Sequence, residues 1–164
     1  RTFSKSYAMT GWRVGYLAAP RAVAEKTAKL HEHTSACTST VSQMAALAAL
    51  DLPESVSQNM VESYQSRRDL LVDGLSRIPG LRPFRPRGTF YSFVDVRAFG
   101  LSSQEMARTL LETARVAVAP GSAFSEHGEG FVRVCFANSE ANILEGIERI
   151  GAALASHSTP AGTR

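Results

Sequence analysis

The sequence lacks the features that would place it in a specialised class of protein. Its 164 residues include only two cysteines, Cys37 and Cys135, which lie far apart and match neither a disulfide framework nor a metal site. We therefore expect a reducing, cytoplasmic environment and two small core cysteines. No apolar run approaches the ~20 residues of a membrane span, and no segment resembles a signal peptide. These absences indicate an ordinary globular protein with no membrane partner.

The sequence also lacks a segment in which residues of one charge are concentrated. The chain has 18 basic and 15 acidic residues, scattered along its length, for a formal net charge of +3. A nucleic-acid interface requires a basic patch or stripe, so none is expected. The 44% hydrophobic content is enough for a sizeable core. Because the chain starts at Arg1 without a methionine and enters an organised pattern at once, we expect a fragment of a longer protein.

Helix and strand signals alternate along the chain. Helix-forming residues with apolar spacing of three or four predict helices at 21–34, 40–51, 54–78 and from about 139, with another after Ser102. Period-two alternation and short apolar runs predict strands at 13–18, 88–96, 116–120 and 131–137. Such alternation is typical of an α/β layered architecture.

Two helix starts carry a capping-box pattern, in which a hydroxyl and a side chain three residues later satisfy free backbone N–H groups. The pairs are Thr40 with Gln43 and Ser102 with Glu105. Behind Ser102, the spacing predicts a buried helical stripe of Ala107, Leu110, Leu111 and Ala114.

The opening segment TFSKSYAMTGWRVGY contains the candidate reactive group. Lys5 lies between two serines, where a lysine by itself would be read as a solvated surface residue. Arg13 interrupts the predicted strand 13–18, where an unpaired guanidinium would be costly, so we expect it to have an anionic partner. Phosphate matches the bidentate guanidinium best. Thr2 adds a hydroxyl able to donate to the same phosphate.

This segment resembles the lysine signature of the class I/II aminotransferases, the fold-type I enzymes that use pyridoxal 5′-phosphate. Lysine, arginine and the intervening MTGWR stand at the family's spacing, and TVSQMAALAAL, GTFYSFVDV, VAVAPGSAF and FVRVCFANSE look like later family segments in the expected order. The resemblance implies that Lys5 forms the Schiff base with the cofactor aldehyde and later acts as the acid/base catalyst. It also implies that Arg13 and Thr2 bind the cofactor phosphate.

Arg133 is the candidate substrate-binding residue. In FVRVCFA, alternation directs Arg133 and Cys135 to the face opposite Val132, Val134 and Phe136. The residues alone leave two roles open for this arginine, an internal salt bridge or an anionic ligand. The resemblance favours a ligand, because the family's arginine for the substrate α-carboxylate lies in the matching strand, just before FANS.

Other candidates are less specific. Phe90, Tyr91 and Phe124 are each expected either to line a substrate pocket or to pack in the core. His31 and His33 are two apart on a predicted helix, where side chains do not face each other, so no metal site is expected.

By this resemblance, residues 1–53 are the end of the large cofactor domain, 54–79 a long interdomain helix, 80–156 the small α+β domain and 157–164 a flexible tail. The expected function is amino-group transfer between an amino acid and a 2-oxo acid by a homodimer. The chain alone is expected to be inactive, because the family's other cofactor residues lie upstream of the lysine.

Two alternatives remain open. One is a pyridoxal-phosphate lyase, because the fold and the lysine do not determine which bond breaks. The other is an aminotransferase-like ligand-sensing domain of a transcription regulator.

Overall fold

The computed structural model describes residues 1–155, which pack as two units. The first unit is Arg1–Met60, and the second begins at Val61, inside the long helix α3 (Glu54–Ser76). The domain limits expected at 53 and 80 stay predictions, and the tail expected at 157–164 lies outside the described residues. No helix within the described part is both long and apolar enough to cross a membrane.

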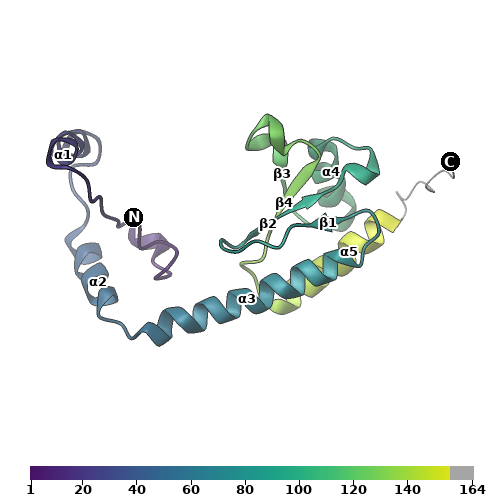
Figure 1. The fold of residues 1–164 in the computed structure, drawn as a ribbon, viewed down its shortest axis with the longest axis horizontal. Coiled ribbons are helices and arrows are strands. Elements are labelled where there is room, and N and C mark those ends of the chain that lie inside the picture. The colour runs from purple at the N-terminus through teal and green to yellow at the C-terminus, as the bar shows by residue number, and fades with distance from the viewer. Residues whose placement is uncertain (156–164) are drawn as a thin grey trace. The chain divides into compact units, whose positions relative to one another are not determined.

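The first unit contains helices α1 (Arg21–Ser35) and α2 (Thr40–Leu50), as predicted (Figure 1). The capping box expected at the start of α2 is wrong. Ser39 is the N-cap residue and makes no capping bond, while Gln43 Nε2 donates to the Thr38 carbonyl at 2.8 Å. Thr40 is already a helical residue, so its hydroxyl is not in the N-cap position that a capping box requires.

The strand predicted at 13–18 does not form within the described residues. Its one β-bridge is between Thr2 and Gly15. Arg13 has a left-handed backbone, with φ of 52°, directly after a 3-10 turn at Thr10–Trp12. A left-handed residue cannot continue an extended ladder, so the apolar run instead forms one side of a closed loop. The loop is held by a small buried cluster of Phe3, Met9, Val14, Ala46 and Ala49.

The second unit is built on a four-stranded antiparallel sheet with the order β1-β2-β4-β3 (Figure 1). Its strands are β1 (Arg82–Pro83), β2 (Tyr91–Asp95), β3 (Ala119–Pro120) and β4 (Phe131–Cys135). The two longer strands lie within the predicted ranges 88–96 and 131–137. In the central pair, Phe93 lies opposite Arg133.

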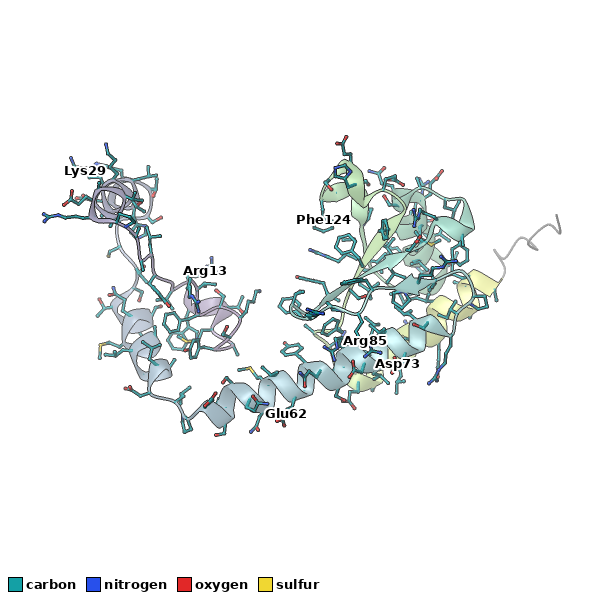
Figure 2. All side chains as sticks on the ribbon, in the orientation of Figure 1. Arg13, Lys29, Glu62, Asp73, Arg85 and Phe124 are labelled. Atoms are coloured by element: carbon teal, nitrogen blue, oxygen red, sulfur yellow. The ribbon has the colours of Figure 1, made fainter. Side chains whose placement is uncertain are left out.

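Helices pack on this sheet and enclose the larger core. They are α4 (Ser103–Thr109), which continues as a π-helical turn over Leu110–Ala114, α5 (Glu140–Ala155) and the second half of α3. The most deeply buried large side chains are Phe136, Leu75, Met106 and Leu154. Near the helices, Arg85 reaches Asp69 and Asp73 of α3, and Figure 2 shows Arg85 beside Asp73.

The start of α4 confirms the second capping box. The Ser102 hydroxyl accepts a hydrogen bond from Glu105 N, and the Glu105 carboxylate accepts one from Ser102 N at 2.9 Å. In the stripe behind it, Leu110 and Ala114 are buried as predicted, but Leu111 is 52% exposed. Successive helical residues point about 100° apart, which turns Leu111 away from the face that its neighbour buries.

The prediction of two core cysteines is wrong. Both Cys37 and Cys135 are free and exposed. Cys37 lies in the connection between α1 and α2, and Cys135 lies on the face of β4 opposite the buried Val132 and Val134. Strand alternation had already assigned Cys135 to that face, and the face is not covered within the described residues.

Candidate functional site

Backbone hydrogen bonds close the opening segment into a loop. Phe3 N donates to Val14 O at 3.2 Å, and Tyr16 N donates to Arg1 O at 2.9 Å. Gly15 lies where the two sides approach most closely, since a Cβ there would be 2.6 Å from Arg1 O. Any other residue at this position would push the two sides of the loop apart.

Thr2 and Arg13 lie on opposite sides of this closed loop. The Thr2 hydroxyl accepts from Ser4 N at 3.1 Å and donates to the Val14 carbonyl at 3.3 Å, next to Arg13 in the chain. Arg13 is exposed, and its Nη1 donates to Thr10 O at 3.2 Å. The burial expected for Arg13 is therefore wrong. The left-handed backbone that ends the 3-10 turn directs this guanidinium outward, and it has no carboxylate within 4 Å among residues 1–155.

Lys5 is exposed on the turn between these two sides. Its carbonyl accepts from Ala8 N at 3.2 Å, and the carbonyl of the preceding Ser4 accepts from the Thr10 hydroxyl at 3.0 Å. The backbone on both sides of the lysine is thus held by hydrogen bonds. The Phe3 ring, buried beneath the turn, anchors it to the cluster on α2.

Arg13 also lines a surface pocket of about 530 Å³ in the first unit. Much of the remaining lining is hydroxyl-bearing and comes from the end of α1 and the start of α2: Ser35, Thr38, Ser39 and Ser42. Guanidinium and hydroxyl donors together suit an anionic ligand. His31 is the single histidine of the lining, and the described residues contain no group of three metal-binding side chains.

In the second unit, Arg133 lies between two aromatic rings. Its Cζ is 4.0 Å from the centroid of the Tyr91 ring and 4.3 Å from that of Phe124. Both separations are within the range of a cation–π interaction. No carboxylate lies within 4 Å of this arginine in the described part of the chain, so the internal salt bridge does not form there. Both rings therefore contact the guanidinium carbon, and a guanidinium keeps its five N–H donors for a ligand while it contacts a ring in this way.

The three ambiguous aromatic residues separate into two groups. Tyr91 and Phe124 contact Arg133, whereas Phe90 packs on the core cluster and stacks with Tyr64 at 6.2 Å. Strand alternation accounts for this division, because neighbouring residues 90 and 91 point to opposite faces.

A polar cluster that joins the buried Ser103 to the exposed Glu129, on the segment that carries Phe124, was not foreseen from the sequence. Ser103 is fully buried, and its backbone N–H and hydroxyl donate to the Glu129 carboxylate at 2.7 and 2.8 Å. These hydrogen bonds, the backbone one first, lower the pKa of Glu129 below its ordinary value. The two residues are 26 apart in the chain, and no local pattern connects them.

Residues 1–150 match the family model described as aminotransferase class I and II. The chain belongs to this family.

Several aminotransferases resemble it along most of its length. It is 39% identical to an aspartate aminotransferase of Pyrococcus horikoshii over 155 residues, which are 93% of this chain and 40% of that protein. It is 42% identical to a probable N-acetyl-LL-diaminopimelate aminotransferase of Bacillus subtilis over 147 residues, which are 90% of this chain and 37% of that protein. The chain thus spans about two fifths of the length of the curated relatives it matches.

Solved structures give the same result. The aromatic aminotransferase of Pyrococcus horikoshii has a TM-score of 0.91 at 38% identity, covering 94% of this chain and 42% of that one. The aspartate aminotransferase of Thermus thermophilus with maleate has a TM-score of 0.82 at 38% identity, covering 92% and 39%. These similarities confirm the fold class predicted from the sequence, the pyridoxal-phosphate transferases of fold type I.

The residues of the opening loop fit the cofactor of an aminotransferase. A primary amine reacts with an aldehyde carbon, and a guanidinium with a nearby hydroxyl matches a phosphate dianion. Lys5, Arg13 and Thr2 provide these three groups from one closed loop. Arg13 keeps N–H donors beyond the one that Thr10 O accepts, which a phosphate requires. Thr2, by contrast, has one O–H and would have to turn it from Val14 O to donate to the phosphate.

Proposed function

We propose that this chain supplies the reactive lysine, the phosphate-binding arginine and the substrate arginine of a pyridoxal-phosphate-dependent aminotransferase, as the C-terminal part of that enzyme. The observation that carries the proposal is the closed loop of residues 1–16, which presents Lys5, Arg13 and Thr2 in a chain of this family. The proposed substrates are an amino acid and a 2-oxo acid. The proposal includes a cytoplasmic homodimer, with neither nucleic acid nor a membrane as a partner.

When bound, pyridoxal 5′-phosphate withdraws electrons from the substrate Cα and so acidifies its hydrogen. Lys5 Nζ would hold the cofactor at its aldehyde carbon. The same amine would take the proton from the substrate Cα. Arg13 and Thr2 would hold the phosphate and so keep the cofactor in position.

Arg133 orients the substrate through its carboxylate. The Tyr91 and Phe124 rings contact the guanidinium and limit its movement, and a carboxylate binds at its N–H groups, where two parallel N–H···O bonds form. An amine without a carboxylate lacks this anchor and is bound more weakly. The site therefore favours amino acids and 2-oxo acids over simple amines and aldehydes.

The test uses the complete protein encoded by the gene that carries this chain, as wild type, Lys5→Ala and Lys29→Ala. Lys29 is an exposed lysine on α1, labelled in Figure 2, and is the matched control. With pyridoxal phosphate added, wild type and Lys29→Ala should absorb near the visible edge, and borohydride should fix the cofactor on the peptide that contains Lys5. Lys5→Ala should lose both signals. Fixation on a different lysine, or on none, would refute the proposal.

A panel of amino acids with 2-oxo acid acceptors then separates the reaction types. Transfer predicts that each amino acid consumed yields its 2-oxo acid and a new amino acid in equal amounts. Release of free ammonia would indicate a lyase instead. Cofactor binding without any turnover would indicate a ligand sensor.

A further inference from the structure

The segment Gly121–Gly130 carries Phe124 and crosses itself closely. A Cβ added to Gly121 would lie 2.0 Å from Gly128 O, and a Cβ added to Gly128 would lie 2.1 Å from Gly121 O. The two backbones are therefore in direct contact, with no room for a side chain. Phe124 N donates to Gly121 O at 2.9 Å, which sets the direction of the ring relative to this crossing.

Two side chains, one on each side of Phe124, tie this segment to α4. The Ser122 hydroxyl lies 2.8 Å from the Ser103 hydroxyl, and both oxygens of Glu129 accept from Ser103. Ser103 is fully buried at the first residue of α4, so it is a fixed attachment point. Glu129 is the one charged member of this attachment and accepts two of its hydrogen bonds.

The segment positions only one of the two rings around Arg133. Tyr91 belongs to β2, whose ladder with β4 fixes it directly. Phe124, labelled in Figure 2, lies outside the ladder and is 49% exposed. Its ring contacts Phe93 edge-on, with centroids 5.8 Å apart. Release of the segment from α4 would remove Phe124 from Arg133, which would then keep Tyr91 as its aromatic contact and be freer to tilt.

We propose that Glu129 is a positioning residue for carboxylate binding: through Ser103 it holds the segment 121–130 so that Phe124 keeps the Arg133 guanidinium in its binding plane. Glu129 does not touch the substrate in this scheme. The inference rests on the proposed role of Arg133 in carboxylate binding. It adds a determinant of substrate affinity outside the site itself.

The experiment measures maleate binding to the complete protein by isothermal titration calorimetry. Maleate is a dicarboxylate and is bound in the Thermus thermophilus relative. Glu129→Ala should raise the Kd about fivefold, as the loss of the contact between Phe124 and Arg133 would, because the charge-assisted hydrogen bonds that hold Phe124 in place are lost. Glu126→Ala is the matched control, since its side chain lies on the same segment and is 89% exposed, and it should leave the Kd within about twofold.

The variant Glu129→Gln distinguishes loss of the attachment from misfolding of the protein. It has almost the same shape and keeps one carbonyl acceptor for Ser103 N, so its Kd should lie between those of wild type and Glu129→Ala. Hydrogen exchange of the amides at 121–130 reports on the attachment without any ligand, and should accelerate in the order wild type, Glu129→Gln, Glu129→Ala.

An unchanged Kd in Glu129→Ala would overturn the positioning role, whether or not exchange accelerates. Transamination, measured on the same proteins, tests the proposed function separately. A protein that shows the expected order of maleate affinities but transaminates no amino acid supports the positioning role and refutes the aminotransferase. If the wild type transaminates amino acids but all variants bind maleate with the same Kd, the aminotransferase is supported and the positioning role of Glu129 is refuted.

Discussion

Two phenylalanines in the second unit should respond in opposite ways to truncation. Phe136 follows β4 and is 1% exposed, whereas Phe124 is 49% exposed and contacts Arg133. A phenylalanine side chain buries roughly 200 Å² when fully enclosed, which at about 25 cal/mol per Å² corresponds to about 5 kcal/mol. Phe136→Ala should therefore lower the free energy of unfolding by about 3–5 kcal/mol. Phe124→Ala should lower it by about 1–2 kcal/mol, because about half of the ring is already in water.

The effect on substrate affinity should have the opposite order, with Phe124→Ala raising the KM more than Phe136→Ala. Phe124→Ala removes a cation–π contact worth about 1 kcal/mol from Arg133, so the KM for the amino acid should rise about fivefold with little change in kcat. Phe136 has no contact with the guanidinium, and its loss should act mainly on stability.

The assay combines urea unfolding with steady-state kinetics on the complete protein, with Phe84→Ala as a control at an exposed position. If Phe124→Ala destabilised the protein as much as Phe136→Ala, burial would not be what separates the two residues. If both variants raised the KM equally, the contact with Arg133 would not be what matters for substrate affinity. Either result would refute the reasoning.

Two further predictions concern stability. The side-chain hydrogen bond from Arg97 lowers the pKa of Asp95 from 3.8 to about 2, so its stabilising contribution is present above pH ~4 and is lost as the pH falls through 2. Asp95→Asn should remove this dependence, and its free energy of unfolding should fall less steeply than that of wild type between pH 4 and 2 in urea titrations. Ser102→Ala breaks a capping box and should cost about 1 kcal/mol in the same assay, whereas Ser39→Ala should cost almost nothing because Ser39 caps no backbone N–H. Equal costs for the two serines would show that the cap on α4 contributes nothing.

The helices were the most predictable part of the fold. The ranges predicted as 21–34, 40–51 and 54–78 appear as α1, α2 and α3 with ends one or two residues away. Helix hydrogen bonds join residues four apart, so the information lies within each segment. The strand predicted at 13–18 does not form in the described part of the chain, because strand pairing depends on residues outside the segment. A strand needs a partner strand, and within the described residues this run forms a single isolated β-bridge, between Thr2 and Gly15.

The candidate site divides in the same way. Lys5, Arg13 and Thr2 lie within twelve residues of one another; the residues themselves indicated an anionic partner for Arg13, and the resemblance to the family implied a phosphate-bearing cofactor. Their assignments, and that of Arg133, stay predictions until the spectra and binding constants are measured. The argument for a buried Arg13 was wrong, because its left-handed backbone directs the side chain outward. The sequence contained no pattern that predicts this left-handed residue.

The sequence by itself determined the limits of the first three helices to within two residues, because helix hydrogen bonds join residues close together in the chain, and its motifs identified the family by resemblance. Only the tertiary structure decided that Tyr91 and Phe124 both contact Arg133, and that Ser103 donates hydrogen bonds to Glu129. These residues come from different strands and loops, and antiparallel pairing with its register sets their distances. The spacing of residues along the chain does not predict contacts across a sheet. The two aromatic contacts of Arg133 and the attachment of the segment 121–130 to α4 can therefore be recognised only in the folded chain.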